Sequence, residues 1–168
     1  MATINQRITN CLWFNNQAEE AANFYASIFK NSKIGKISRY GKEGFEFHGQ
    51  QPGTAMTVNF KLDGQEFCAL NGGPQFKFNE AMSLIINCTS QEEIDYYWER
   101  LTKDGEEGPC GWLKDKFGVS WQVVPVQLSE MLTQPDAEKA QRVTKAFLQM
   151  KKFDLEKLKE EFEKEMVG

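Results

Sequence analysis

The sequence predicts an α+β fold made of two βαβββ modules, followed by a helical extension at the C-terminus. Three observations support this prediction. The order of one strand, one helix and several strands occurs twice; the spacing of apolar residues becomes helical after residue 125; and 168 residues suffice for one sizeable core but not for two ordinary domains. Two modules of roughly 50 to 70 residues, each too small for its own core, would therefore share one domain over residues 1–126.

The first module is expected over about residues 5–75. Its first strand is the apolar run at residues 7–14, and Asn16 with Glu19 supplies a capping pair for the next helix. That helix carries apolar residues at helical spacing, namely Ala21, Ala22, Phe24, Tyr25, Ile28 and Phe29. Three further strands are expected at residues 33–40, 54–62 and 65–71. Asp63 and Gly64 join the last two as a two-residue hairpin.

The second module is expected over about residues 80–126. A strand at 81–88 precedes a capping box formed by Ser90 and Glu93. One face of the following helix carries Ile94, Tyr97, Trp98 and Leu101, and Tyr96-Tyr97 echoes Phe24-Tyr25 of the first module. A strand near Trp112, a turn at 115–118 and an apolar run at 119–125 complete the repeat.

The C-terminal region, residues 127–168, has the pattern of amphipathic helices. Ala140, Val143, Phe147 and Met150 share one face of the stretch 136–150, and Asp154 caps a further helix that carries Leu155, Leu158, Phe162 and Met166. The alternating charges of this last helix indicate a solvated face. We expect the helices to pack on the domain or on a partner subunit.

Composition excludes several classes of function. The net charge is −4 and the isoelectric point about 5.2, which disfavours nucleic acid as a partner. No signal peptide or membrane-spanning run is visible, so we expect a cytoplasmic protein that does not bind membranes. The four cysteines, Cys11, Cys68, Cys88 and Cys110, are far apart in sequence and are expected to be reduced, buried thiols.

Five segments in order resemble the PhnB-like branch of the glyoxalase, bleomycin resistance and dioxygenase (vicinal-oxygen-chelate) superfamily. They are CLWFNNQAEEAANFYASIF at 11–29, FCALNGGPQFKFNEAMSLIINC at 67–88, QEEIDYYWERL at 91–101, CGWLKDKFGVSWQVVP at 110–125 and RVTKAFLQMKKFDLEKL at 142–158. Members are often named 3-demethylubiquinone 3-methyltransferase domain proteins. The resemblance implies mixed sheets that curl around a cavity, a homodimer and, in some relatives, a divalent metal ion that chelates vicinal oxygens of the substrate.

Strand periodicity suggests which residues face that cavity, because alternate side chains point to opposite faces of a sheet. The more polar face of each strand should line the cavity. By the same alternation, Thr9, Cys11, Ala69, Ile85 and Ser120 are also expected to face it. The resulting ligand-binding set is Trp13, Thr57, Asn59, Asn71, Ser83, Asn87 and Gln122. A small, partly polar molecule is the expected ligand, although the same side chains could instead bond one another and water in an inert concavity.

The resemblance places Gln122 where metal-dependent relatives carry a metal-binding Glu. The other ligand positions fall on Thr9 or Asn10, Ala69 or Asn71, and Ser83, none of which is a His or a carboxylate. Neutral amides and hydroxyls are poor ligands for a divalent transition metal, so we expect no metal, with Gln122 as the one candidate ligand. His48 stands alone in a glycine-rich segment and is expected to be a surface or packing residue.

No catalytic residue is identified. Methyl transfer would require a nucleotide-type cofactor, yet no glycine-rich turn joins a strand to a helix, so no cofactor is expected. Cys110, Glu66 and Asp115 are candidates for chemistry, but ordinary loop and turn roles explain them as well. Three hypotheses for the function follow. The first is a protein that binds a small molecule without a metal. The alternative is a metal-dependent lyase, isomerase or dioxygenase that uses Gln122, and the third is a module that serves only in assembly.

Overall fold

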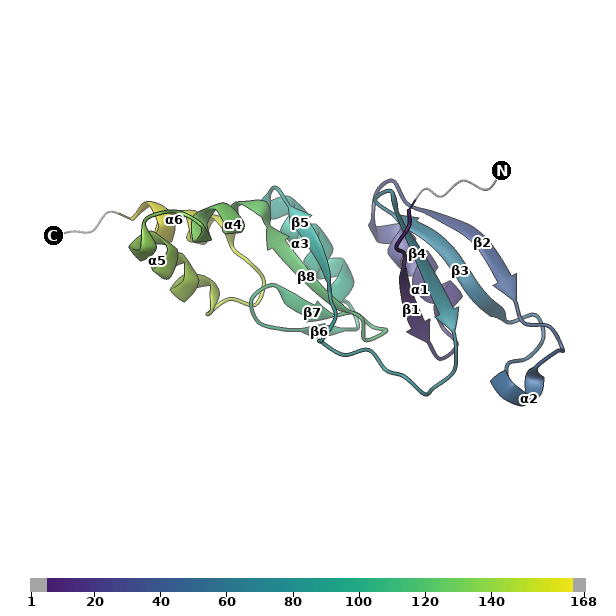
Figure 1. The fold of residues 1–168 in the computed structure, drawn as a ribbon. Coiled ribbons are helices and arrows are strands. Elements are labelled where there is room, and N and C mark those ends of the chain that lie inside the picture. Colours follow the sequence, from purple (N-terminus) through teal and green to yellow (C-terminus); the bar gives the residue numbers. More distant parts are fainter. Residues whose placement is uncertain (1–5, 165–168) are drawn as a thin grey trace. The chain divides into compact units, whose positions relative to one another are not determined.

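The structure is a computed structural model that describes residues 6–164, and it divides into two compact units at Phe78 and Asn79. Each unit contains one strand, one helix and three further strands in a four-stranded mixed sheet (Figure 1). The predicted α+β class, the two βαβββ modules and the C-terminal helices are confirmed. The curling of the sheets around a shared cavity stays a prediction. Residues 1–5 and 165–168 of the predicted ranges lie outside the described part.

The first unit is built on a sheet with the strand order β1-β4-β3-β2. Its strands are β1 (Asn10–Phe14), β2 (Lys33–Arg39), β3 (Ala55–Leu62) and β4 (Gln65–Asn71). β1 runs parallel to β4, and the other neighbours are antiparallel. The helix α1 (Ala18–Ile28) covers one face, and a short helix α2 (Phe45–His48), which the sequence pattern did not predict, follows β2.

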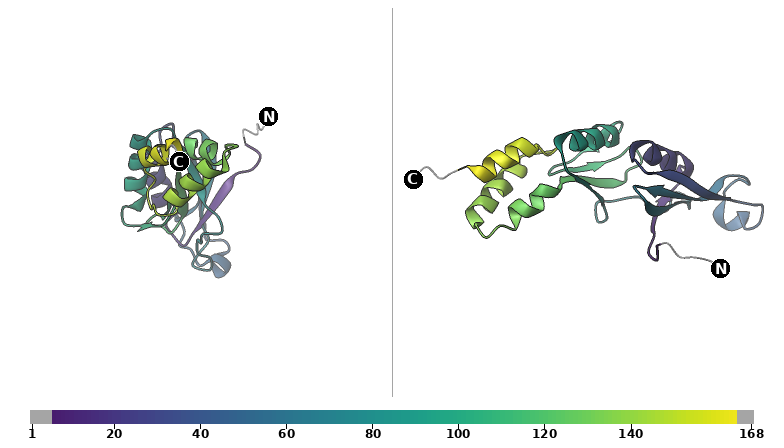
Figure 2. Two further views of the ribbon diagram at one scale, coloured as in Figure 1. Left: turned by 90° about the vertical axis from the view of Figure 1, so that its left-hand side faces the viewer. Right: turned by 90° about the horizontal axis from the view of Figure 1, so that it is seen from above.

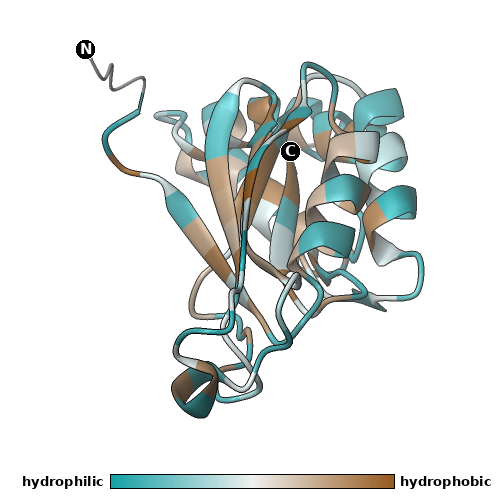
Figure 3. Ribbon diagram, turned by 90° about the vertical axis from the view of Figure 1, so that its right-hand side faces the viewer, coloured by the Kyte–Doolittle hydropathy of each residue, from teal (hydrophilic) through white to brown (hydrophobic). Residues whose placement is uncertain are grey.

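Alternation along the strands places the core of this unit under α1. Val58, Phe60 and Ala69 are almost fully buried, as are Ala18 and Ala22 of α1, the helix that packs on β3 and β4. Apolar and polar bands alternate along the strands in Figure 3. Small helix residues let α1 approach the sheet closely, and each large side chain buried there contributes about 1.5–3 kcal/mol.

The second unit repeats this arrangement with the strand order β5-β8-β7-β6. Its strands are β5 (Leu84–Cys88), β6 (Glu106–Glu107), β7 (Trp112–Lys114) and β8 (Ser120–Pro125), and its first helix is α3 (Gln91–Thr102). β5 is parallel to β8, as β1 is to β4. The two parallel ladders place Cys11 beside Cys68 and Ile85 beside Gln122, so Cys68 and Gln122 occupy equivalent positions.

Three further helices follow β8: α4 (Val126–Leu132), α5 (Ala137–Phe147) and α6 (Leu155–Glu163). α5 and α6 lie side by side (Figure 2). The segment between them is hydrogen-bonded to its own unit: the amide of Cys110 donates to Met150 O at 2.8 Å, and the amide of Leu155 donates to the Gln91 side chain at 2.8 Å. No described helix has the length and apolar character that crossing a membrane requires.

A glycine permits this contact with the C-terminal segment. Gly111 has a φ of +79°, and a Cβ there would lie 2.4 Å from Cε2 of Phe153. Since neither the conformation nor the space admits a side chain, glycine is required at this position.

Two local predictions are wrong. Asn16 does not cap the first helix, because α1 begins at Ala18 after Gln17, and Gln17 makes no side-chain capping bond. The predicted correspondence between Phe24-Tyr25 and Tyr96-Tyr97 is also wrong, by one residue. Counted from the capping residues Gln17 and Ser90, Tyr25 corresponds to Trp98, and both side chains are buried.

Candidate functional site

The candidate site is the face of the second unit's sheet opposite α3, which we call the open face. Alternation directs Trp121 and Val123 of β8 toward α3, where both are buried. Gln122 therefore points to the open face, with Ile85 and Trp112 beside it in register on the neighbouring strands. The Gln122 side-chain amide donates to Ser83 Oγ at 2.9 Å, so the structure brings these two predicted residues together.

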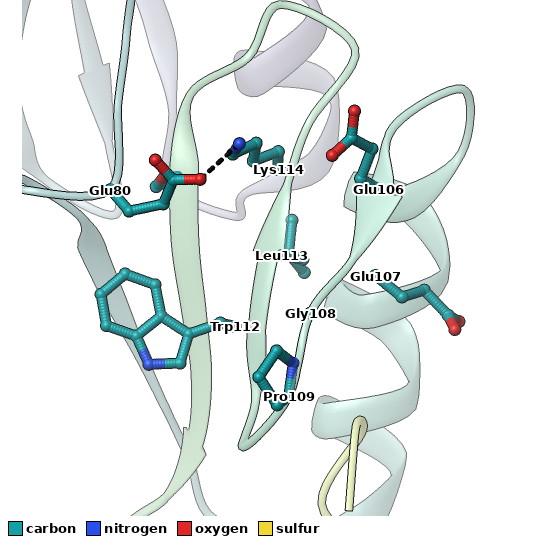
Figure 4. A pocket seen from close by; sticks show the side chains of 9 residues that line it. Glu80, Glu106, Glu107, Gly108, Pro109, Trp112, Leu113 and Lys114 are labelled. Atoms are coloured by element: carbon teal, nitrogen blue, oxygen red, sulfur yellow. Dashed lines mark ion pairs between the residues drawn. The ribbon is translucent and has the colours of Figure 1, made fainter.

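A hollow of about 360 Å³ lies along the hairpin that carries β6 and β7. Its lining includes Trp112, Pro109 and an ion pair between Glu80 and Lys114. Figure 4 shows the Lys114 ammonium directed at the Glu80 carboxylate, with Trp112 and Pro109 farther along the hairpin. The hollow thus offers an aromatic ring, a proline and paired charges within one small volume.

Ser120 contributes a buried hydroxyl to the lining. Its side chain is on the open face in register with Lys114, and the residue is 1% exposed. Ser120 Oγ has no hydrogen-bond partner among the residues that the structure describes. Buried polar groups are nearly always hydrogen-bonded, so an unpaired hydroxyl beside a hollow indicates a place for a bound water or ligand.

The charged residues of the hollow are mainly acidic. The lining contains three carboxylates, Glu80, Glu106 and Glu107, and one ammonium group, Lys114. The hydrogen bond with Lys114 lowers the pKa of Glu80, and the same bond raises the pKa of Lys114. Both groups therefore remain charged at neutral pH. Glu107 pairs with Lys151, which lies outside the lining, so Glu106 is the carboxylate that gives the lining its negative charge.

The first unit holds Trp13, Thr57 and Asn59 on the face opposite α1. Trp13 Nε1 donates to Gly73 O at 2.8 Å, and the hydroxyl of Thr57 bonds that of Ser38 at 2.6 Å. Asn59 is exposed. Thr57 and Trp13 therefore already have local partners, and Asn59 presents its amide to solvent.

The predicted orientation of Asn71 is wrong. Asn71 is 2% exposed and lies on the α1 side, where its Oδ1 accepts from the amide of Ala18 at 2.9 Å and its Nδ2 donates to Ala55 O at 2.9 Å. Ala69 is buried on the same side, so Cys68 and Leu70 face away from α1 instead. The polarity of Asn71 was a misleading signal, because its amide serves the backbone.

The other candidates are distributed over both units. Asn87 is exposed near the end of β5, next to Val124 in register. His48 belongs to α2 and packs against Tyr40, with ring centroids 4.4 Å apart. Glu66 forms an ion pair with Lys61 at 2.8 Å, and Cys110 Sγ donates to Phe147 O at 3.7 Å. These contacts are structural.

Asp115 organises the turn before β8. The residue is 3% exposed, and its carboxylate accepts hydrogen bonds from the amides of Phe117 and Val119 and from the Trp121 indole at 2.8, 3.1 and 2.8 Å. This arrangement leaves the carboxylate no role as a solvent-facing acid. It does fix the start of β8, and with it the positions of Ser120 and Gln122.

The donor set does not fit a divalent transition metal. Gln122 uses its amide nitrogen to bond Ser83, and both side chains are neutral. Within residues 6–164 no cluster of three or more His, Cys, Asp or Glu side chains could hold a metal ion. Such ions prefer imidazole, thiolate or carboxylate ligands, so no chemical step is assigned to a metal at this face.

Sequence reasoning did not place Trp112, Glu80 and Lys114 in a site. A signal was present in β7, where Trp112 and Lys114 alternate with the buried Leu113 and so share a face. Glu80 had no such signal, because it precedes β5 in a segment without regular structure.

Comparison with known proteins assigns the family. The family model described as 3-demethylubiquinone-9 3-methyltransferase matches residues 6–124. The chain belongs to this PhnB-like family. The PhnB protein from Bacillus cereus is 40% identical over 72% of this chain and 100% of its own, with a TM-score of 0.63. Helices α4 to α6 follow the residues that the PhnB-like family model matches.

More distant structures share the fold of this PhnB-like protein. A protein from Pseudomonas aeruginosa is 18% identical over 72% of this chain and 98% of its own, with a TM-score of 0.57. The fosfomycin resistance protein FosX from Mesorhizobium loti is 13% identical over 79% of this chain and 100% of its own, with a TM-score of 0.54. No curated protein sequence matches the chain.

Proposed function

We propose that this PhnB-like protein binds a small, partly polar molecule on the open face of the second unit, without a metal ion held by its side chains. The observation that carries the proposal is the unpaired, buried hydroxyl of Ser120 beside the hollow lined by Trp112 and the Glu80–Lys114 pair. At about 360 Å³ the hollow is large enough for a small ligand.

Each lining group has a distinct role in this proposal. The Trp112 ring covers an apolar or aromatic part of the ligand, and Ser120 Oγ forms a hydrogen bond that the free protein lacks. Gln122 and Ser83 provide further polar contacts beside Trp112. The acidic lining favours a neutral or cationic ligand over an anionic one.

Three aromatic probes of different charge test the proposal. Benzamidine, phenol and benzoate would each be titrated into the ¹⁵N-labelled protein while amide and indole resonances are followed. We expect shifts around Trp112 and Ser120, and benzamidine to bind roughly two- to fivefold more tightly than phenol, since a cation over an exposed aromatic ring contributes about 0.5–1 kcal/mol. Benzoate should bind most weakly.

Variants decide whether the binding uses this hollow. Trp112→Ala and Ser120→Ala should each weaken benzamidine binding, whereas Ser129→Ala, an exposed change on α4, should not. Binding that is unaffected by Trp112→Ala, or no shift with any of the three probes, would overturn the proposal.

Metal analysis tests the metal-dependent alternative. The protein would be purified without metal-affinity chromatography, analysed for bound elements and screened by thermal shift against Zn, Ni, Mn and Fe(II). We expect no stoichiometric metal and no shift. Stoichiometric metal that is lost in Gln122→Ala would instead establish Gln122 as a ligand and contradict the metal-free proposal.

The family description does not supply an activity for this chain. Gly72 and Gly73 follow β4, but no helix lies between β4 and β5, so these glycines do not form a strand–turn–helix phosphate cradle. Methyl transfer is therefore not part of the proposed function.

A homodimer belongs to the proposal as well. Met82 and Ile85 are 60% and 57% exposed near the open face, and a second copy of the chain would cover such apolar side chains. Sedimentation equilibrium should give twice the chain mass at micromolar concentration. A monomer at that concentration would remove the dimer from the proposal.

A further inference from the structure

Cys11 and Cys68 form a pair of neighbouring thiols in the first unit. They are directly in register on the parallel strands β1 and β4. Neighbouring strands are about 4.7–4.9 Å apart, which lies within the range of Cα separations of about 4.4–6.8 Å that a disulfide bond accepts. Alternation places both side chains on the face opposite α1, because Leu12 and Ala69, the next residues along each strand, are buried under that helix.

The two thiols contact each other. Burial, the charge of the neighbouring Cys11 and a hydrogen bond between the two side chains together raise the pKa of Cys68 to about 11. Cys11 is exposed, so the prediction of buried thiols is wrong for this residue, whereas Cys68 is half-buried. One thiol is therefore open to a reagent from solvent, and the second lies within reach of the first.

The other two cysteines differ in position and contacts. Cys88 is buried in β5, where its thiol donates to Ile86 O at 3.8 Å, and Cys110 contacts Phe147 O in the same unit. Burial raises the pKa of the Cys88 thiol to about 12. Both are bonded to backbone carbonyls, and they provide internal controls for the thiol pair.

We propose that Cys11 and Cys68 form a reversible disulfide when the protein meets a low-molecular-weight disulfide such as oxidised glutathione. The Cys11 thiolate attacks one sulfur of the reagent, which breaks the reagent's S–S bond, forms a mixed disulfide and releases one thiol. The Cys68 thiolate then attacks the Cys11 sulfur and releases the second thiol. Two cysteine thiols are oxidised, one reagent disulfide is reduced, and the two protons pass to the released thiols.

The bond would cross-link the edge of the first sheet. β1 pairs only with β4 among the described strands, so the disulfide would join an edge strand covalently to its single neighbour. Trp13 lies two residues along β1 on the same face, and Asn59 is in register with Cys68. Oxidation would thus change the chemistry beside two predicted ligand-binding residues, a consequence that is independent of the proposed site in the second unit.

Mass spectrometry with thiol alkylation tests the proposal. The reduced protein would be incubated with oxidised glutathione, unfolded in denaturant so that the buried Cys88 also reacts, alkylated and digested. In the wild type we expect two of the four cysteines to escape alkylation and a cross-linked peptide pair that contains Cys11 and Cys68. Dithiothreitol should restore four alkylated cysteines.

Single variants separate the two steps. Cys68→Ser should stop at a stable glutathione adduct on Cys11, and Cys11→Ser should give no intramolecular disulfide. Cys110→Ser should behave as the wild type. The proposal is overturned if the wild type ends at the Cys11 adduct as Cys68→Ser does, if four alkylatable thiols persist, or if the disulfide joins two chains on a non-reducing gel.

Discussion

The helices of the two modules are capped by different means. In the second unit Ser90 Oγ accepts from the amide of Glu93 at 3.3 Å, and the Glu93 carboxylate accepts from the amide of Thr89 at 2.7 Å. In the first unit the amide of Ala18 donates to Asn71, a residue 53 positions away at the end of β4. The equivalent end of β8 is Pro125. One cap is local in sequence and the other depends on the sheet.

The turns that precede the last strand of each module also differ in how they are stabilised. Asp63 and Gly64 form an exposed hairpin turn with φ angles of 46° and 80°. Asp115 opens the equivalent turn before β8, but it is buried and accepts three hydrogen bonds. In each module one buried, hydrogen-bonded polar side chain therefore fixes the last strand: Asp115 at the start of β8 and Asn71 at the end of β4.

The largest effect is expected from Asp115→Ala. Two backbone amides and the Trp121 indole would lose their acceptor in a buried environment, and the free energy of unfolding of the second unit should fall by about 3 kcal/mol or more. Urea denaturation monitored by hydrogen exchange and mass spectrometry resolves the two units. Asp63→Ala is the matched control and should change stability by less than about 1 kcal/mol. Equal losses in the two variants would show that the turns are equivalent.

Asn71→Ala should have the second-largest effect, confined to the first unit. The change leaves the amide of Ala18 and the carbonyl of Ala55 without their buried partner, at about 2–3 kcal/mol. Asn59→Ala removes the same side chain from an exposed position of the neighbouring strand and should be nearly neutral. Hydrogen exchange should accelerate in α1 and β3 for Asn71→Ala alone. Faster exchange in α3 would contradict the assignment.

The contrast between the caps also explains which parts of the fold could be predicted from the sequence. The Ser90 cap, the Asp63-Gly64 hairpin and the alternation of β3 depend on residues close in the chain, and the sequence pattern identifies them. The role of Asn71 as a cap depends on a partner far away in sequence, so strand alternation and polarity predicted the wrong face for its side chain. At the candidate site Ser83 and Gln122 were predicted, whereas Glu80 is brought to Lys114 only by tertiary folding.

Ser90→Ala should have a smaller effect than Asn71→Ala, because its cap has a second component. The loss of one exposed capping bond lowers the free energy of unfolding by about 1 kcal/mol. Thr89 still donates to Glu93 through its amide and its hydroxyl, which retains part of the cap. Chemical denaturation of the variant, with Gln17→Ala as the control in the other module, measures the difference. A loss as large as that of Asn71→Ala would indicate that the local cap is the more important one.

The smallest expected effect is a pH-dependent change at Trp98, the residue of α3 that corresponds to Tyr25 of α1. The Trp98 indole donates to the Glu107 carboxylate at 3.0 Å, and this hydrogen bond lowers the pKa of Glu107, with a further contribution from Lys151. Because the pKa is lower in the folded protein, the associated stabilisation is present above the ordinary Glu pKa of about 4.3 and is lost as the pH falls through the lowered value. The Trp98 indole resonance should therefore titrate with a midpoint below about 4.3. Glu107→Gln should abolish that titration, and a midpoint at or above the ordinary value would show that the indole does not hold the carboxylate in its charged form.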